Sequence, residues 1–289
     1  MTQTIVSSHS HRVRIAPHRR TVVIGERCNT LGYKKVRETV MRGEWQEVVG
    51  RAKDQFEAGA GIINVNMVGL DIPEKTLLPL AVSVIRAEVD APLSLDFGDP
   101  DALDLALGNI EGRTLINSIS GEAEKLDQIL PIAQKHDSPM IALLCDDDGI
   151  PDTPKGRLRV AENILKAAEP FGKTVEDFIF DCVGIGIATD VNAGQCTLDT
   201  IELVRQELNA NITLGASNVS FGMPKRRVID AHYLSIAISR GMNAPLTDIM
   251  SEPLRWALMA TDAIMGKDKL GIRFIREVRA DAADTSVAA

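Results

Sequence analysis

The sequence predicts an α/β fold, a single (β/α)8 TIM barrel. Two observations predict it: short apolar runs alternate with longer amphipathic segments, and no domain-length linker interrupts the alternation. The chain has 289 residues, of which 45% are hydrophobic, so it is long enough to bury one large core.

The predicted strands are eight short runs that are apolar throughout, without alternation between apolar and polar residues. Continuous apolar character is typical of parallel strands that are covered on both faces. The runs span residues 21–25, 61–66, 92–96, 113–117, 139–145, 177–181, 211–217 and 244–248.

The predicted helices are longer segments whose apolar residues recur at helical spacing. They span residues 44–60, 73–88, 121–136, 156–172, 197–210, 225–241 and 251–266. A doubly wound sheet is the alternative arrangement, and it usually carries G-x-G-x-x-G after its first strand. That place holds "GERCNTLG" at residues 25–32, which favours the barrel.

The two ends of the chain carry no clear periodic pattern. Residues 1–20 have no apolar signal core, and we expect a flexible arm, although its three histidines could also be interpreted as metal ligands. Residues 274–289 are expected to form a flexible tail, which leaves the barrel at residues 21–273.

Composition excludes several classes of function. The net charge is −8 and no basic tract is present, which argues against nucleic-acid binding. The apolar runs are too short to span a bilayer, so no membrane segment is expected. The four cysteines show neither C-x-x-C nor zinc spacing, and with no secretory signal they predict a cytoplasmic protein with reduced thiols.

Polar residues end all eight predicted strands. Active sites of (β/α)8 barrels are built at the carboxyl ends of the strands. Asp and Asn also terminate strands and cap helices, so any one of them alone can be structural, but eight together predict a site. In chain order these residues are Glu26, Asn64 with Asn66, Asp96, Asn117, Asp146 to Asp148, Asp181, Asn218 and Asp248.

The residue types in this ring narrow the chemistry. No histidine or lysine stands at a strand end, so neither a Schiff base nor a histidine-activated nucleophile is indicated. Carboxylates accept hydrogen bonds from amino and ring N–H groups, and amides both donate and accept. The ring therefore suits a flat heterocycle such as a pterin or a purine, and no metal site is predicted.

Six motifs carry a resemblance to a known family. They are "IGERCNTLG" (24–32), "NVNMVGLD" (64–71), "LSLDF" (93–97), "LINSISGE" (115–122), "FIFD" (178–181) and "LGASNVSFGMPKR" (214–226). Between residues 21 and 271 the chain resembles the pterin-binding methyltransferases. These are the methyltetrahydrofolate:corrinoid protein methyltransferases and the folate domain of cobalamin-dependent methionine synthase.

The resemblance implies roles for individual residues. Asp96, Asn117 and Asp181 match residues that hold the pyrimidine edge of the pterin. Asn218 matches an asparagine beside N5 of tetrahydropterin and is the predicted catalytic residue, and Arg226 matches a basic residue after the same loop. The pterin-binding set expected from the resemblance is completed by Asn66, Glu26 and Asp248.

The function that the resemblance implies is methyl transfer between N5 of tetrahydrofolate and the cobalt of a corrinoid. Family members are homodimers without a metal of their own, and the cobalamin arrives on a separate corrinoid protein. The nearest match to the cobalamin motif D-x-H-x-x-G is "DAHYLS" at residues 230–235, which lacks the glycine. Our hypothesis is that Asn218 stabilises protonated N5, with the proton coming from solvent.

Two alternatives stay open. A dihydropteroate synthase would need an N-x-T-P-D-S-F loop after the first strand and S-x-R after the last, where this chain has "CNTLG" and "TDIMSEP". A non-catalytic folate-binding barrel would not need an amide at N5. Asn64, Phe97 and Phe221 depart from the family pattern, and the corrinoid partner, the primary methyl donor and the direction of transfer are not determined.

Overall fold

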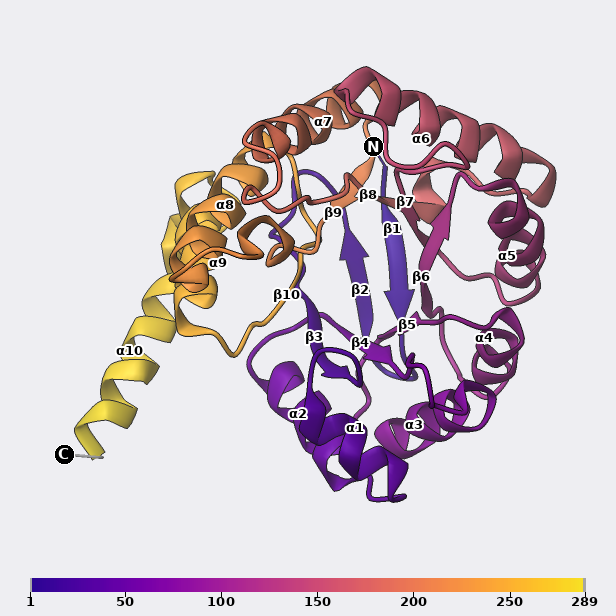
Figure 1. Ribbon diagram of the computed structural model, residues 1–289. Coiled ribbons are helices and arrows are strands. Elements are labelled where there is room, and N and C mark those ends of the chain that lie inside the picture. Colours follow the sequence, from indigo (N-terminus) through magenta and orange to yellow (C-terminus); the bar gives the residue numbers. More distant parts are fainter. Residues whose placement is uncertain (1, 288–289) are drawn as a thin grey trace.

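The computed structural model describes residues 2–287 and contains a nearly closed barrel of eight parallel strands (Figure 1). The order of the strands is β10-β3-β4-β5-β6-β7-β8-β9. A parallel bridge from Gly215 to Leu246 joins the two ends of this order. The predicted (β/α)8 fold is therefore confirmed. The strands are β3 (Ile24–Asn29), β4 (Ile62–Asn66), β5 (Leu93–Asp96), β6 (Leu115–Ser120), β7 (Met140–Leu143), β8 (Phe178–Asp181), β9 (Asn211–Thr213) and β10 (Leu246–Thr247).

Helices surround the barrel. They are α1 (Lys34–Met41), α2 (Gln46–Glu57), α3 (Glu74–Glu88), α4 (Pro100–Leu107), α5 (Ala123–Lys135), α6 (Pro154–Ala168), α7 (Ala193–Leu208), α8 (Arg226–Arg240), α9 (Glu252–Ile264) and α10 (Ile272–Val287). Short 3-10 turns are η1 (Glu169–Phe171), η2 (Val175–Asp177), η3 (Asn218–Ser220) and η4 (Lys269–Gly271). The sequence did not predict α4, because eight residues are too few to show a helical period; Asp99 caps it by accepting from the backbone N–H of Asp101.

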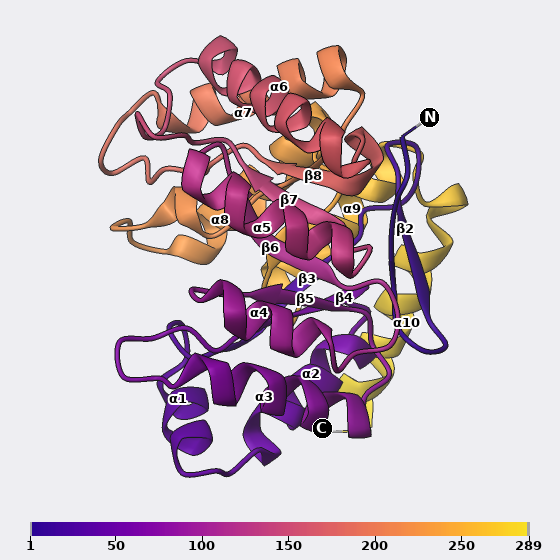
Figure 2. The same ribbon diagram turned by 90° about the vertical axis from the view of Figure 1, so that its right-hand side faces the viewer.

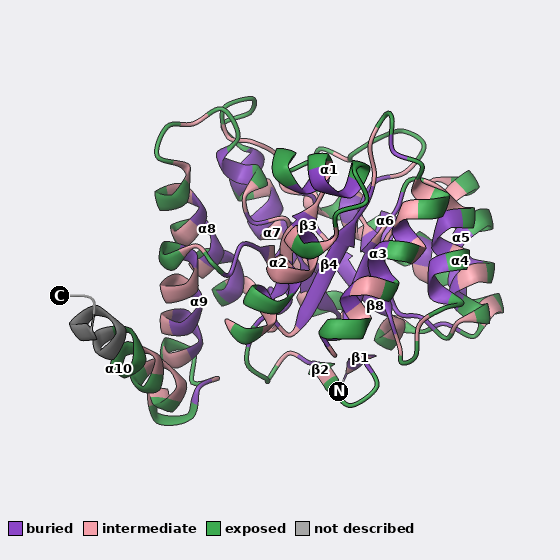
Figure 3. Cartoon of the chain, turned by 90° about the horizontal axis from the view of Figure 1, so that it is seen from below, coloured by how far each residue is buried: buried purple, intermediate pink, exposed green. Residues whose placement is uncertain are grey.

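Two hydrophobic layers explain why the strands are apolar throughout. Alternate strand residues face outward and pack against the helices. The others face inward, and Ile24, Ile62, Leu115, Ile141 and Ile179 form a separate cluster inside the barrel. Figure 3 shows the buried residues concentrated in the strands and on the inner faces of the helices.

The structure of the N-terminal segment differs from the prediction of a flexible arm. Residues 4–15 form an antiparallel hairpin of β1 (Thr4–Ser7) and β2 (Arg12–Ile15), where a flexible arm was expected. Val6 and Ile15 are almost fully buried in the inner cluster, and the Asn211 side chain donates hydrogen bonds to the hairpin. The hairpin covers the amino-terminal end of the barrel (Figure 2). Two four-residue strands are too short for their period to stand out in the sequence.

The C-terminal segment also differs from its prediction. The prediction of a flexible tail over residues 274–289 is wrong where α10 runs, while residues 288–289 lie outside the described part. The helix projects from the barrel beside α9 (Figures 1 and 3). Phe274 packs edge-on against Trp256, with ring centroids 5.8 Å apart, and the Asp268 carboxylate accepts from the backbone N–H groups of Arg273 and Phe274. Between residues 2 and 287, none of the helices has the length and apolar character needed to cross a membrane.

Candidate active site

A cavity of about 590 Å³ lies at the carboxyl ends of the strands. The sequence-predicted residues Glu26, Asp96, Asn218 and Arg226 all line it. They come from β3, β5, η3 and α8, so only the closed barrel brings them together. The other lining residues are Asn29, Gly32, Tyr33, Asn64, Gly215, Ser217, Phe221, Arg227, Asp230 and Leu246.

A polar row on three adjacent strands adjoins the cavity, which Asp96 lines and Asn66 and Asn117 do not. Asn66, Asp96 and Asn117 are register partners on β4, β5 and β6, so their side chains leave the sheet on the same face. Asn117 is linked to the cavity through Asn64, because its side-chain N–H donates to the Asn64 Oδ1 at 3.2 Å. The ladder between β6 and β7 shifts register just after Asn117.

Asp96 is the charged residue of this row, between two asparagines, and it is partly buried. Burial raises the pKa of Asp96 to about 6, and hydrogen bonds from Asn66 and Asn64 oppose that rise. A partly buried carboxylate flanked by amides is a strong acceptor for a pair of N–H groups on a flat ligand.

Asp181 stands at the carboxyl end of β8 but does not line the cavity. Its Oδ1 accepts from the backbone N–H of Val183 at 2.8 Å, where the chain turns with a left-handed φ of 58°. The buried guanidinium of Arg157 donates to the carbonyls of Cys182 and Val183 and holds the same turn. Burial raises the pKa of Asp181 to about 6. One of its oxygens is therefore committed to the turn.

A bulge in β3 sets the position of Glu26. The pairing with β4 shifts register between Gly25 and Cys28, and bulges of this kind re-aim a side chain next to a site. Gln55 supports the bulge by accepting from the backbone N–H of Arg27 at 3.0 Å, and a Cβ at Gly25 would lie only 2.6 Å from the Gln55 Oε1. A side chain at Gly25 would therefore displace the support.

Glu26 has a strongly perturbed carboxyl group in the cavity. Burial, followed by the nearby charge of Asp248, raises the pKa of Glu26 to about 7, while Arg227 opposes the rise. Asp248 itself does not line the cavity. It is buried and contacts two arginines, Arg27 at 3.4 Å and Arg227 at 3.3 Å, which it holds on either side of the strand end.

The loop that contains Asn218 is the exposed edge of the cavity. Asn218 opens η3, its backbone N–H donates to the Gly215 carbonyl at 3.1 Å, and its side chain is exposed. Arg226 braces the loop by donating to the Ser217 carbonyl at 2.8 Å and the Ser220 hydroxyl at 2.9 Å. It also stacks on Phe221, with 4.4 Å from guanidinium carbon to ring centroid. Arg226 therefore lines the cavity and also stabilises the loop that contains Asn218.

The sequence did not single out Tyr33, Arg227 or Asp230 as site residues. Asp230 is buried on α8, one turn after Arg226, and its Oδ1 has no hydrogen-bond partner among the described residues. The only signal in the sequence was the helical spacing from Arg226, which carries no information about burial. Within residues 2–287, no group of three or more histidine, cysteine, aspartate or glutamate residues is placed to hold a metal ion.

A (β/α)8 barrel with a carboxylate–amide cavity at its strand ends defines a class of heterocycle-binding barrels. Residues 25–247 match the model of the family described as pterin binding enzyme, which is most of the chain. The chain belongs to the pterin-binding enzymes, and the family predicted from the six motifs is confirmed.

Curated relatives cover almost the whole chain. The methylcorrinoid:tetrahydrofolate methyltransferase of Eubacterium limosum is 27% identical over 261 residues, which is 89% of this chain and 96% of the relative. The methionine synthase of Mycobacterium tuberculosis is 26% identical over 257 residues, or 83% of this chain. The match spans only 21% of that much longer protein.

Solved structures show the same fold. The 7,8-dihydropteroate synthase of Vibrio fischeri superposes with a TM-score of 0.71 over 91% of this chain and 99% of that one, at 14% identity. The dihydropteroate synthase of Yersinia pestis gives 0.67 at 15% identity, with the same coverage. At such low identity the likeness concerns the fold alone.

Proposed function

We propose that this protein is a tetrahydrofolate-dependent methyltransferase. It moves a methyl group between N5 of tetrahydrofolate and the cobalt of a corrinoid carried by a separate protein. One observation carries the proposal: a single cavity joins the partly buried carboxylate of Asp96 to the exposed amide of Asn218 at its edge. The names of the curated relatives support the same chemistry.

The pterin ring would bind with its pyrimidine edge against the row on β4, β5 and β6. Asp96 accepts from the amino and ring N–H groups, with Asn64 and Asn117 beside it. Donation from the ligand favours the ionised carboxylate and so offsets the cost of its burial. Asp181 would serve through the oxygen that the β8 turn leaves free. Its contact with the ring stays a prediction.

The opposite side of the cavity would hold the reacting atom. Asn218 would lie against N5 at the exposed edge, where a corrinoid protein has access. In the direction that the name of the E. limosum relative indicates, the N5 lone pair forms the new bond to the methyl carbon. The electron pair of the cobalt–carbon bond stays on cobalt, and the N5 proton leaves. In the reverse direction, N5 keeps the electron pair of the broken bond and takes up a proton.

A titratable side chain for this proton is present in the cavity. Glu26 lines the same cavity as Asn218, and its pKa of about 7 allows it to take or give a proton near neutral pH. The hypothesis from the sequence has N5 exchange its proton with solvent, and we propose Glu26 as the proton acceptor in the cavity. Asn218 would then orient N5 and stabilise its protonated form as a pre-placed dipole. A cytoplasmic homodimer stays a prediction.

The test is a single-turnover reaction of methyltetrahydrofolate with cob(I)alamin, followed by the absorbance of cobalt. We expect loss of the cob(I)alamin signal with the wild-type protein and a much slower loss with Asn218→Ala. Gln128→Ala, an exposed change on α5, is the control and should react at the wild-type rate.

The other two functions predict different results. Condensation of a pterin pyrophosphate with an aromatic amine, without reaction at cobalt, would indicate a dihydropteroate synthase. Saturable folate binding without either reaction would indicate a non-catalytic barrel. Each of these outcomes would contradict the proposed methyl transfer.

A further inference from the structure

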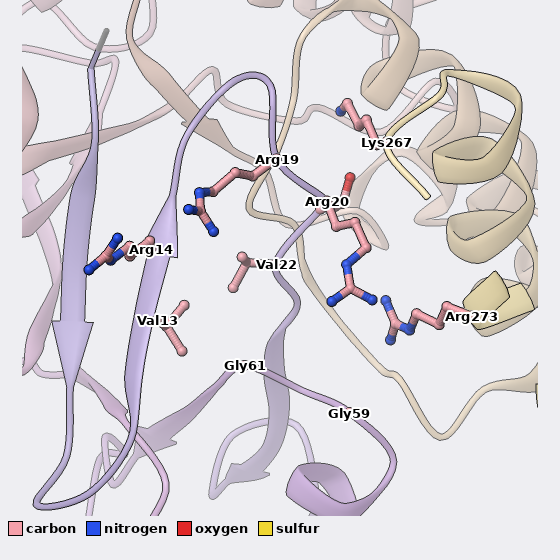
Figure 4. Close-up of a pocket in the computed structure, with 10 residues that line it drawn as sticks. Val13, Arg14, Arg19, Arg20, Val22, Gly59, Gly61, Lys267 and Arg273 are labelled. Atoms are coloured by element: carbon pink, nitrogen blue, oxygen red, sulfur yellow. The ribbon is translucent and has the colours of Figure 1, made fainter. Parts of the chain in front are cut away.

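A second cavity, of about 530 Å³, lies near the amino-terminal ends of β3 and β4. Five of its lining side chains are cationic and none is acidic, in a chain whose net charge is −8. Figure 4 shows the cationic side chains around this cavity, contributed by the N-terminal segment and by the region around α10. Its lining residues are Val13, Arg14, Arg19, Arg20, Thr21, Val22, Gly59, Gly61, Lys267 and Arg273.

The five cations have no ion-pair partner among the described residues. Of the three carboxylates whose charges act on Arg273 (Glu277, Asp262 and Asp268), the last two are already engaged with neutral groups. Asp262 accepts from the backbone N–H and the hydroxyl of Thr21 at 2.9 and 2.7 Å, and Asp268 accepts from two backbone N–H groups of α10. Their charges offset part of the repulsion without pairing to a guanidinium. Positive charge is therefore left in excess in this cavity.

Two of the arginines come close to each other. Figure 4 shows the guanidinium groups of Arg20 and Arg273 side by side, although like charges repel. Burial, followed by the charge of Arg20, lowers the pKa of Arg273. The carboxyl end of α2 lies beside Gly59 and offers only partial negative charge. An anion between the two guanidinium groups would remove the repulsion.

Glycines keep the floor of this cavity open. Gly59 has a left-handed φ of 94°, and a Cβ there would lie 3.2 Å from the Arg273 Nη2. A Cβ at Gly61 would lie 2.8 Å from a methyl carbon of Val22. Any side chain at these two positions would fill the space in front of the arginines.

We infer that this cavity is a second ligand site, which binds a compact polyanion through its phosphate groups. Guanidinium groups pair with phosphate oxygens in a planar, two-pronged geometry, and four arginines and a lysine can neutralise several charges at once. The volume fits a small molecule. Val22 and Gly61 precede β3 and β4, whereas Glu26 and Asn64 lie in these strands, so the site is distinct from the pterin cavity and independent of the proposed function.

The test is isothermal titration of the full chain with inorganic tripolyphosphate at low ionic strength. We expect saturable binding at one site, weakened by added salt because salt screens exposed charges. The double variant Arg20→Ala with Arg273→Ala removes charge-assisted hydrogen bonds and should bind at least about tenfold more weakly. The matched control, Arg159→Ala with Lys166→Ala, removes two exposed cations from α6 and should bind like the wild type.

Parallel titration with ATP identifies the source of the phosphates. Equal binding of ATP indicates a nucleotide, and binding of tripolyphosphate alone indicates an inorganic chain; both support the site. No saturable binding to the wild type, or equal weakening in the control, would overturn the inference. Binding of an acidic peptide to this face without binding of tripolyphosphate would also overturn it, in favour of a protein partner. Thermal unfolding of each variant verifies that it folds.

Discussion

Glu26→Gln tests whether burial and Asp248 raise the pKa of Glu26. The folded pKa of about 7 exceeds the ordinary value of 4.5, so the folded state holds the proton more tightly than the unfolded state. As pH rises from about 4.5 to 7, Glu26 ionises in the unfolded state before it ionises in the folded state. Glu26 therefore increasingly disfavours folding over this pH range. At about 1.4 kcal/mol for each pH unit, the difference approaches about 3 kcal/mol, an upper value for a residue that is not fully buried.

The assay is urea unfolding of both proteins between pH 5 and pH 8.5. The variant should gain unfolding free energy relative to the wild type as pH rises, and the gain should level off above the folded pKa. Glu88→Gln, an exposed change at the end of α3, should show no such gain. A stability difference that is independent of pH, or one that grows toward low pH, would refute the assignment.

Three further predictions concern binding, catalysis and the hairpin. Asn218→Ala should lower kcat/KM by an amount that corresponds to about 2–4 kcal/mol of transition-state stabilisation, the usual cost of losing a pre-placed donor. It should leave pterin binding nearly unchanged in equilibrium titration. Asp96→Asn should weaken pterin binding by about 1.5–3 kcal/mol in the same titration, since a charged acceptor is lost. Ile15→Ala should lower the unfolding free energy by about 2–5 kcal/mol in urea, because Ile15 is 1% exposed; Ile272→Ala, at 44% exposed, should change it by less than about 0.5 kcal/mol. Equal effects of the two isoleucine changes, or an Asn218 variant that only loses binding, would contradict these assignments.

Much of the fold could be predicted from the sequence, because the signals for it are local. Continuous apolar runs indicated the eight strands, and polar residues at their carboxyl ends indicated which end carries the site. The hairpin was missed because its burial depends on the barrel end that it covers. The path of α10 was missed because it depends on contacts such as that between Phe274 and Trp256.

The sequence alone determined the family, the barrel and the polar character of the strand ends, since motifs and periodicity are properties of neighbouring residues. Only the tertiary structure decided which polar groups act together. The pKa of Glu26 depends on its burial and on Asp248, and Arg226 is a brace because the Ser217 carbonyl lies within its reach. The cationic cavity likewise depends on the tertiary structure, because Arg20 and Arg273, which are far apart in the sequence, line it together. Desolvation and charge interaction act through space, and closure of the barrel sets the distances over which they act.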